Sequence, residues 1–357
     1  MKNFKNILIV RTDRIGDVVL TTPAIKALRQ RYPQARISIL VNPLTYDLVD
    51  GNPDIDEVIV DDRKNAHKGA LGFWKLVGEL RQRKFDLAII FHTKKRTNLL
   101  CWLAGIPHRT GYRNEKLGFL LNHPLKDRRH FGEKHEAEYC LDVVRHLTAA
   151  SNPALKELEL FVPIKEESQR WLKQFLFENN ISESDKVIVI HPGASDPARY
   201  WPHDRFAEII NCLVDRYQAK IILVGSVAIR TTIREIMVLV KGSVASRGGV
   251  VFDMSGLTTV SQLVSLLKRS DLLISNDSGP VHIAAAVKTP VISIFTRNQP
   301  GINPERWAPL NKKSISIAVA RDNAISFKKA GSLDPQYSQL IPTQEVLEAV
   351  DVIFKLC

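Results

Sequence analysis

The 357-residue sequence predicts an α/β protein built from two doubly wound parallel sheets. Short apolar runs rich in β-branched residues alternate with longer stretches of helical periodicity, which is typical of repeated strand–helix units. The runs are continuously apolar rather than alternating, as expected of parallel strands covered by helices on both faces. The chain is also too long for one typical domain and is long enough for two.

The predicted strands fall into two groups, one in each half of the chain. They are Asn6–Val10, Arg36–Leu40, Glu57–Val60 and Asp86–Phe91 in the first half, and Val187–His191, Lys220–Gly225, Gly249–Phe252, Asp271–Ser275 and Val291–Phe295 in the second. Two of the predicted helices have clear start signals. Thr259 and Gln262 have the spacing of a capping box, and the last helix begins near Thr343, directly after a proline.

A polar, proline-containing stretch between roughly Thr148 and Lys165 separates the two groups of strands. Such composition is typical of a linker, so we expect domains of residues 1–160 and 161–357, with the last helix a candidate to pack back onto the first domain. Two such domains facing one another leave a cleft. Open α/β sheets bind ligands at the carboxyl ends of their strands, so the functional residues are expected there.

Hydropathy and cysteine content favour a cytoplasmic protein. No apolar run reaches the roughly 18 residues that a membrane helix needs. The N-terminal run Ile7–Val10 is too short for a signal peptide, and Arg11 ends it. The four cysteines lie far apart and form no Cys-x-x-Cys pair. They therefore predict neither a disulfide framework nor a zinc site.

The net charge of +12 is concentrated in the first half of the chain. Residues 1–165 contain 28 lysines and arginines against 19 acidic residues, whereas residues 166–357 contain 22 against 19. The excess is densest at Lys94–Arg96 and Lys126–Arg129. It indicates either a solvated basic surface or an anionic partner, which would be a phosphorylated acceptor, a membrane surface or a nucleic acid.

The first strand runs into the segment RTDRIGD, residues 11–17, which ends in the first turn of a predicted helix. Gly16 permits a close backbone approach at this turn. The segment is neither the glycine fingerprint of a dinucleotide site nor a Walker loop, and a carboxylate here would repel phosphate. Asp17 is therefore either a general base acting on a neutral hydroxyl or a charge that only offsets the helix dipole.

The segment after Val187–His191 favours an oxyanion site. It places small residues with available backbone N–H groups, up to Ser195, before the cation Arg199. The alternative is a plain loop followed by a proline-led helix, which describes Trp201-Pro202 but leaves Arg199 unexplained.

The segment NDSGPVH, residues 276–282, is the strongest signal. Asp277 or Ser278 can cap the helix that follows, and Pro280 suits its first position. The N–H groups around Ser278 and Gly279 would then form an anion site, beside which Asp277 would accept hydrogen bonds from sugar hydroxyls.

Together these segments resemble glycosyltransferase family 9, the ADP-heptose:lipopolysaccharide heptosyltransferases. The resemblance covers nearly the whole chain in the family's order, through Ile7–Pro23, Phe85–Arg96, Ala104–Arg113, His191–Pro202 and Ser255–Ala286. It implies a GT-B type fold, an acceptor-binding N-terminal domain and a donor-binding C-terminal domain. It also implies inverting, metal-independent transfer of heptose from ADP-L-glycero-D-manno-heptose to the lipopolysaccharide inner core, with the ADP-sugar as co-substrate and no cofactor.

The resemblance assigns roles to individual residues. Asp17 takes the position of the general base, and the donor diphosphate site comprises Ser195, Arg199, Asp277, Ser278, Gly279 and His282. Arg199 stands where relatives carry a lysine, and Val227–Ile229 stand where many carry a glutamate that meets the ribose. The basic residues Lys95, Arg96 and Arg113 would suit an anionic glycolipid acceptor and peripheral contact with the cytoplasmic face of the inner membrane.

Other function classes have less support. A related transferase would use a different nucleotide sugar, and a non-catalytic protein would only bind a nucleotide sugar or glycolipid. Asp17 argues against a protein that only binds, because such a protein needs no base at this position. Nucleic acid is not an expected partner, because no recognised binding motif accompanies the charge. A nicotinamide dehydrogenase would need the absent glycine fingerprint.

Overall fold

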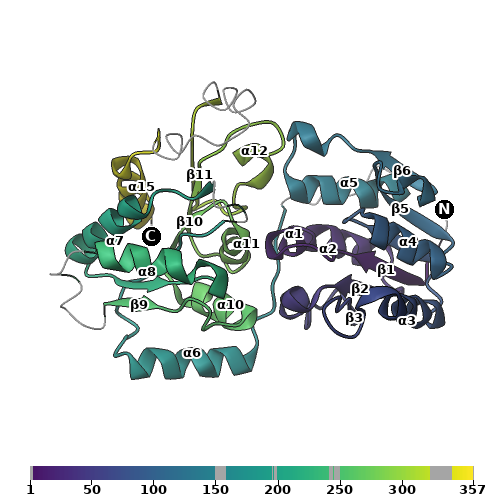
Figure 1. The fold of residues 1–357 in the computed structure, drawn as a ribbon, viewed down its shortest axis with the longest axis horizontal. Coiled ribbons are helices and arrows are strands. Elements are labelled where there is room, and N and C mark those ends of the chain that lie inside the picture. The colour runs from purple at the N-terminus through teal and green to yellow at the C-terminus, as the bar shows by residue number, and fades with distance from the viewer. Residues whose placement is uncertain are drawn as a thin grey trace. The chain divides into compact units, whose positions relative to one another are not determined.

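The computed structural model describes residues 3–148, 158–194, 196, 199–240, 244, 250–321 and 340–356 (Figure 1). The chain divides into two compact units, Met1–Pro163 and Ile164–Cys357. The boundary between the units follows residue 163, whereas we predicted it after residue 160. Residues 149–157 of the predicted linker lie outside the described part of the chain.

Unit 1 contains a six-stranded sheet in the order β3-β2-β1-β4-β5-β6. Its strands are β1 (Asn6–Val10), β2 (Arg36–Val41), β3 (Glu57–Val60), β4 (Leu87–Ile90), β5 (His108–Arg113) and β6 (His123–Lys126). Its helices are α1 (Ile15–Val19), α2 (Thr22–Arg31), α3 (Gly69–Gln82), α4 (Lys95–Leu103) and α5 (Glu136–Thr148), with 3₁₀ turns η1 (Pro43–Leu48), η2 (Gly118–Leu120) and η3 (Arg129–Phe131).

Unit 2 contains a second six-stranded sheet in the order β12-β11-β10-β7-β8-β9. Its strands are β7 (Val187–His191), β8 (Lys220–Leu223), β9 (Val251–Asp253), β10 (Leu272–Asn276), β11 (Val291–Phe295) and β12 (Ile315–Ala318). Its helices are α6 (Glu166–Glu178), α7 (His203–Tyr217), α8 (Arg230–Leu239), α10 (Val260–Arg269), α11 (Gly279–Ala286), α12 (Pro304–Trp307) and α15 (Thr343–Leu356), with the 3₁₀ turn η5 (Val227–Ile229).

Both sheets have the same winding, and their neighbouring strands pair in parallel. The strand order reverses between β1 and β4 in unit 1 and between β7 and β10 in unit 2. Ligands of doubly wound sheets bind outside the carboxyl ends of the strands at such reversals. The segments predicted to carry chemistry follow β1, β7 and β10, so the topology places them where a ligand is expected.

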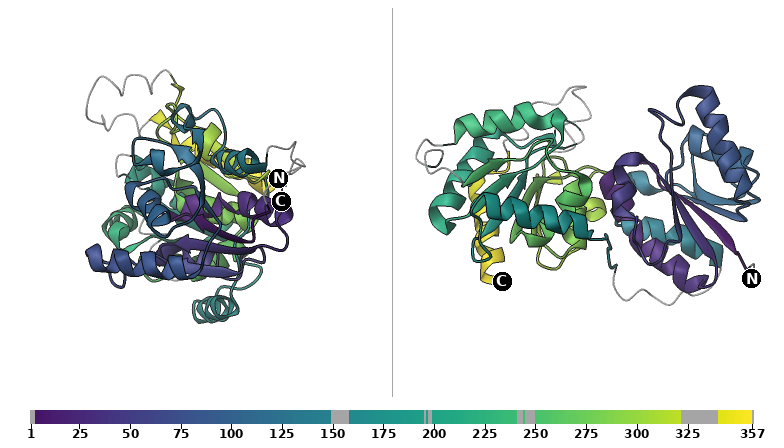
Figure 2. Two further views of the ribbon diagram at one scale, coloured as in Figure 1. Left: turned by 90° about the vertical axis from the view of Figure 1, so that its right-hand side faces the viewer. Right: turned by 90° about the horizontal axis from the view of Figure 1, so that it is seen from below.

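Each sheet packs its apolar strands against helices, and Figure 2 shows helices on both sides of each sheet. In unit 1 one cluster joins buried residues of β1 and β4 to α3 and α4. In unit 2 the corresponding cluster joins β7, β8 and β10 to α7, α8 and α15. The predicted α/β class with two doubly wound parallel sheets is confirmed. Within the described ranges, no helix is both long and apolar enough to cross a bilayer.

Three strands were not predicted from the sequence: β5, β6 and β12. The sequence of β5, HRTGYR, is polar, and only its Thr110, Gly111 and Tyr112 are buried. β6 and β12 are edge strands that are mostly half-buried, so neither needs a continuous apolar run. Burial on both faces, which the prediction relied on, is weaker at these positions.

The predicted helix starts are present in the structure. The Thr259 hydroxyl accepts a hydrogen bond from the Gln262 N–H at 3.1 Å, and the Gln262 side chain accepts one from the Thr259 N–H at 2.8 Å. The last helix, α15, begins at Thr343 and packs on α7, β11 and β12. Its apolar face is therefore used within unit 2.

Trp201 anchors the start of α7 to the core of unit 2. The indole is fully buried, lies edge-on to Phe206 at 5.0 Å, and donates from Nε1 to the Ile341 carbonyl at 2.9 Å. Truncation to alanine leaves a cavity and removes the indole hydrogen bond to the Ile341 carbonyl, so Trp201→Ala should cost about 3–5 kcal/mol of stability. Phe177→Ala, at an exposed position in the same unit, should change stability little. Urea unfolding followed by circular dichroism would contradict this account if both variants lost the same stability.

Candidate active site

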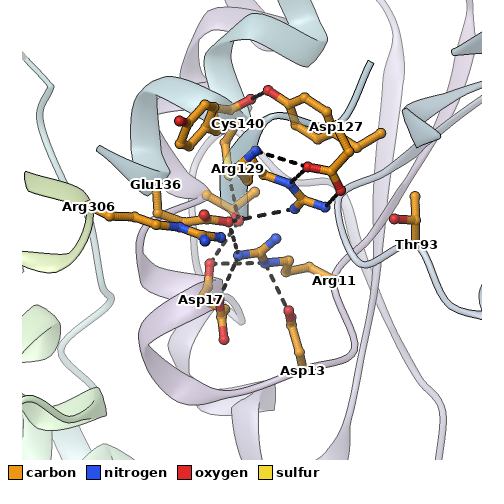
Figure 3. A network of polar contacts seen from close by, with 12 residues as sticks. Arg11, Asp13, Asp17, Thr93, Asp127, Arg129, Glu136, Cys140 and Arg306 are labelled. Atoms are coloured by element: carbon orange, nitrogen blue, oxygen red, sulfur yellow. Dashed lines mark hydrogen bonds and ion pairs between the residues drawn. The ribbon is translucent and has the colours of Figure 1, made fainter. Parts of the chain in front are cut away.

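A buried arginine organises the carboxyl end of β1 (Figure 3). Arg11 is only 1% exposed, and its guanidinium contacts three carboxylates. Nε lies 3.2 Å from Asp13 Oδ1, and Nη2 lies 3.0 Å from Asp17 Oδ1 and 3.2 Å from Glu136 Oε1. A buried guanidinium is costly unless it is paired, and these contacts supply the pairing.

Arg11 also fixes the backbone that carries Asp17. Its Nε donates to the Asp17 carbonyl at 3.1 Å, and the Thr21 hydroxyl donates to the same carbonyl at 2.8 Å. The Asp17 side chain stays 17% exposed, whereas the side chain of Glu136 is 2% exposed. Asp17 is therefore held firmly while one side of its carboxylate remains reachable.

The cluster changes the acidity of its members. Burial raises the pKa of Asp17 to about 7; Arg11 opposes this shift, whereas the negative charges of Asp13 and Glu136 add to it. Burial also raises the pKa of Asp13. The pKa of Arg11 lies above its usual value because the surrounding carboxylates outweigh the effect of its burial. Asp17 can therefore exchange a proton near neutral pH, as a general base requires.

A second arginine supports the cluster from the side of α5. Arg129 binds Asp127 through two nitrogens, at 2.7 and 3.0 Å, and its Nη1 lies 4.0 Å from Glu136. Its guanidinium covers the Tyr112 ring at 4.3 Å, and the Tyr112 hydroxyl donates to the Tyr139 carbonyl at 2.9 Å. Glu136 is thus held between two arginines, which fixes the third carboxylate around Arg11.

The basic residues predicted to contact an acceptor have different surroundings. Lys95 is exposed in the first turn of α4, and Arg113 is exposed at the end of β5. Arg96, in contrast, binds the buried Asp61 through two nitrogens, at 2.8 and 3.1 Å, and covers the Phe73 ring at 5.0 Å. The Arg96 guanidinium therefore mainly joins α4 to the end of β3 through Asp61 and to α3 through Phe73.

A neutral histidine lies at the carboxyl edge of the first sheet. Beyond β4, His92 Nδ1 lies 3.2 Å from the Thr12 hydroxyl, which also accepts a hydrogen bond from Arg63 at 3.2 Å. Burial lowers the pKa of His92 to about 3, and four nearby cations lower it further: Arg11, Lys94, Arg63 and Arg129. His92 is therefore neutral at physiological pH.

In unit 2 the ends of β7 and β10 meet at a histidine. His191 lies beside Ser275 in the register of the two strands, and its Nδ1 is 3.2 Å from the Ser278 hydroxyl. The Ser275 and Ser278 hydroxyls lie 2.8 Å apart. Burial lowers the pKa of His191 to about 4, so the ring is neutral. Asn276 joins the same two strand ends, because its side chain donates to the Pro192 carbonyl and accepts from the Trp201 N–H.

Arg199 and Asp277 lie together beside this histidine site. Arg199 Nη1 is 3.4 Å from Asp277 Oδ2, and the Arg199 carbonyl accepts a hydrogen bond from the Thr296 hydroxyl at 3.1 Å. Both charged residues line a small hollow with Thr296 and Arg297. The structure thus brings together a predicted cation and a predicted sugar-contacting carboxylate at the end of β10.

The start of α11 completes the donor side. Gly279 is its first residue, and Ser278 precedes it in an extended conformation without capping the helix through its side chain, because that hydroxyl faces His191. His282 is buried on α11, with its ring 6.5 Å from that of Trp307. Ser195 lies outside the described residues. The helix dipole adds a partial positive charge beside Arg199.

The turn η5 occupies the space beside two glycines, one after β7 and one after β8. A Cβ atom on Gly193 would lie 2.7 Å from Ile229 Cδ1, and one on Gly225 would lie 2.2 Å from the same atom. Ile229 therefore packs directly on two strand-end backbones. This turn stands where the resemblance expects an acidic contact to the ribose.

The sequence did not predict the roles of Arg11, Asp13 and Glu136. An arginine directly after four buried strand residues is a usable signal, because a charge in that position must be paired. Asp13 follows Arg11 closely enough to be recognised as one partner. Glu136 lies 125 residues from Arg11, so no local pattern connects the two.

Two doubly wound parallel units with polar clusters at both reversal points are the architecture of a GT-B type protein. The chain belongs to glycosyltransferase family 9 (heptosyltransferase), whose family model matches residues 73–336. It is therefore a glycosyltransferase, and the resemblance inferred from the sequence is confirmed. The matched range includes the donor-side segments and begins after Asp17.

Relatives extend the similarity over the whole chain. Lipopolysaccharide heptosyltransferase 2 of Escherichia coli K12 is 29% identical over 363 residues, which cover 97% of this chain and 98% of the relative. The crystal structure of a family 9 glycosyl transferase from Veillonella parvula has a TM-score of 0.83 at 23% identity, over 99% of this chain and 98% of that one. The structure of heptosyltransferase WaaC of E. coli with ADP has a TM-score of 0.72 at 16% identity, over 98% of this chain and 99% of that one. These structures confirm the GT-B type fold.

The Arg11 cluster predicts how Asp17 responds to its neighbours. Glu136→Gln removes a negative charge that raises the Asp17 pKa, so that pKa should fall below about 7. The measurement is an NMR titration of ¹³C-labelled aspartate carboxyls, with the Asp17 signal assigned by Asp17→Asn. Glu133→Gln, at an exposed position nearby, is the matched control and should leave the value unchanged. An unchanged Asp17 titration in Glu136→Gln would contradict the coupling.

Proposed function

We propose that this protein transfers heptose from ADP-L-glycero-D-manno-heptose to the inner core of lipopolysaccharide, with inversion and without a metal ion. The observation that carries this proposal is the Arg11 cluster. It holds Asp17 partly exposed, with a pKa near 7, at the carboxyl edge of the first sheet. The relative that is similar over 97% of this chain is a lipopolysaccharide heptosyltransferase.

In the proposed reaction Asp17 is the general base. It takes the proton from an acceptor hydroxyl as that oxygen bonds to the anomeric carbon of the donor. The bond from that carbon to the diphosphate breaks on the opposite side, and ADP leaves with the electron pair. One in-line displacement inverts the anomeric centre. Asp13 binds the same arginine, but Asp17 lies on α1 at the position that the family resemblance assigns to the base.

Unit 2 would stabilise the departing diphosphate. Arg199 supplies a full positive charge, and the backbone at Ser278 and Gly279 presents the positive end of α11. These groups would take the place of a metal ion. Asp277, which pairs with Arg199, would accept hydrogen bonds from sugar hydroxyls, and His282 and Ser195 belong to the same proposed donor site. ADP is the favoured nucleotide because the similar WaaC structure contains it.

Unit 1 would bind the acceptor, an anionic glycolipid. Exposed basic side chains of this unit would bind the phosphate or carboxylate groups of that acceptor. Lys95 and Arg113 are exposed and available for such contacts, whereas Arg96 mainly supports the fold. Because the acceptor is a lipid, we propose that the protein is cytoplasmic and contacts the inner membrane peripherally.

One observation favours a second candidate, a family 9 transferase with a different nucleotide sugar. The η5 turn, Val227–Ile229, is apolar, and Ile229 packs between Gly193 and Gly225. It offers no carboxylate to a ribose. The choice of nucleotide would then depend on other contacts.

A transfer assay with purified ADP-heptose and a heptose-deficient core acceptor tests the proposal. Wild-type protein should transfer heptose equally well with and without EDTA. Asp17→Asn should lower kcat about 10²–10⁴-fold, because loss of a positioned base has that effect. Asp204→Asn, at an exposed position outside the cluster, is the matched control and should retain the rate. Equal losses in both variants would contradict the assignment of Asp17 as the base.

Calorimetry of ADP, UDP and GDP binding tests the donor side. Arg199→Ala should weaken ADP binding by roughly 10- to 100-fold, because it removes a charge-assisted hydrogen bond. Arg199→Lys should retain part of that affinity, and the exposed control Arg234→Ala should retain all of it. Tighter binding of UDP or GDP than of ADP would contradict the ADP-heptose donor and favour the second candidate.

A further inference from the structure

An exposed apolar pair on α3 is unexplained by the fold or the site. Leu71 is 88% exposed and Trp74 is 55% exposed. They lie three residues apart on one helix, so they share a face. Single exposed apolar residues are common, but a leucine and a tryptophan together at the start of a surface helix form a small apolar surface.

Three exposed lysines lie close to this pair along the chain: Lys64, Lys68 and Lys75. The loop before α3 holds two of them in place. His67 donates from its N–H to the Asp62 carbonyl at 2.7 Å and accepts from the Asp62 N–H at 3.1 Å. The backbone of His67 packs so closely on Gly72 that a Cβ there would lie 2.3 Å from it. The backbone that carries Lys64 and Lys68 is therefore held beside the first turn of α3.

The aromatic part of the surface is also held in place. Trp74 lies edge-on to Phe73, with ring centroids 6.1 Å apart. Phe73 is covered by the Arg96 guanidinium at 5.0 Å, and Arg96 binds the buried Asp61. The Trp74 ring thus contacts a Phe73 ring that Arg96 holds in place.

We propose that this α3 face, comprising Leu71, Trp74, Lys64, Lys68 and Lys75, docks unit 1 on an anionic lipid bilayer. Tryptophan and leucine insert at the boundary of headgroups and acyl chains, while lysines next to them bind anionic headgroups. Charge complementarity therefore selects a bilayer with negative headgroups. The proposal rests on the proposed function, because a lipid-linked acceptor requires the enzyme to work at a membrane.

The position of the face within unit 1 agrees with that use. The loop before α3 continues directly from β3, and its Arg63 donates to the Thr12 hydroxyl at 3.2 Å. Thr12 lies between Arg11 and Asp13 in the cluster that holds Asp17. A bilayer bound at α3 would therefore lie near the carboxyl edge at which the acceptor hydroxyl is expected to react.

Vesicle co-sedimentation of the full-length protein tests the proposal. Wild-type protein should bind vesicles of phosphatidylglycerol and phosphatidylethanolamine, and salt should weaken the binding. Vesicles of phosphatidylcholine alone should bind little. The double variant Leu71→Ser, Trp74→Ser and the triple variant Lys64→Glu, Lys68→Glu, Lys75→Glu should each lose at least about tenfold in partitioning, because several apolar and charge contacts are removed.

Matched controls come from exposed residues of unit 2. Phe177→Ser with Val238→Ser removes two comparably exposed apolar side chains, and Arg170→Glu, Lys173→Glu, Lys313→Glu reverses the same number of charges. Both should bind as the wild type does, with folding of all variants checked by thermal melting. Unchanged binding by the α3 variants, or no wild-type binding, would overturn the proposal. So would sedimentation showing a wild-type dimer that the Leu71, Trp74 variant dissociates, because the face would then join two copies.

Transfer to a water-soluble acceptor fragment separates this proposal from the proposed function. The α3 variants should transfer heptose to that fragment at the wild-type rate and lose activity only toward acceptor in vesicles. Loss of transfer to both acceptors would overturn a docking role. If the wild type bound vesicles through α3 but transferred no heptose to either acceptor, the docking face would stand and the proposed reaction would fail.

Discussion

The contact between Arg11 and its carboxylates is the interaction on which the proposed chemistry depends. A guanidinium at the end of a fully buried strand is tolerated only when opposite charges surround it, and breaking a buried pair costs several kcal/mol. Asp13, Asp17 and Glu136 meet this requirement from the loop after β1, from α1 and from α5. The same contacts that stabilise the arginine orient Asp17 and crowd it with negative charge. Structural and chemical demands are therefore met by one cluster.

The two units share one sheet topology but have different polar groups at their reversal points. At the reversal point of unit 1, carboxylates gather around a buried cation, and one of them remains reachable with a pKa near 7. At the reversal point of unit 2, a neutral histidine and two serine hydroxyls lie beside Arg199 and the start of α11. The first arrangement suits removal of a proton, and the second suits an anionic leaving group. A displacement at a nucleotide sugar needs both.

Much of this could be predicted from the sequence, because the relevant patterns are local. Continuous apolar runs marked the buried strands, and the capping box at Thr259 marked the start of α10. The polar strand β5 lacks such a pattern, since its burial depends on neighbours already in the sheet. Arg96 was predicted as an acceptor contact from its charge alone. Only the tertiary structure shows that its guanidinium is paired with Asp61. Glu136 became part of the site through the packing of α5, which no sequence spacing encodes.

The central claim is that Asp17, held by Arg11, is the group that must lose its proton before the acceptor can attack. The most direct measurement is the dependence of wild-type kcat/KM for heptose transfer on pH. Because the pKa of Asp17 is raised, its base form is depleted below about pH 7 and complete above it. We therefore expect kcat/KM to rise with pH to a plateau, with a midpoint near 7. A midpoint near 4, the value of an unperturbed aspartate, or a flat profile across this range would contradict the account.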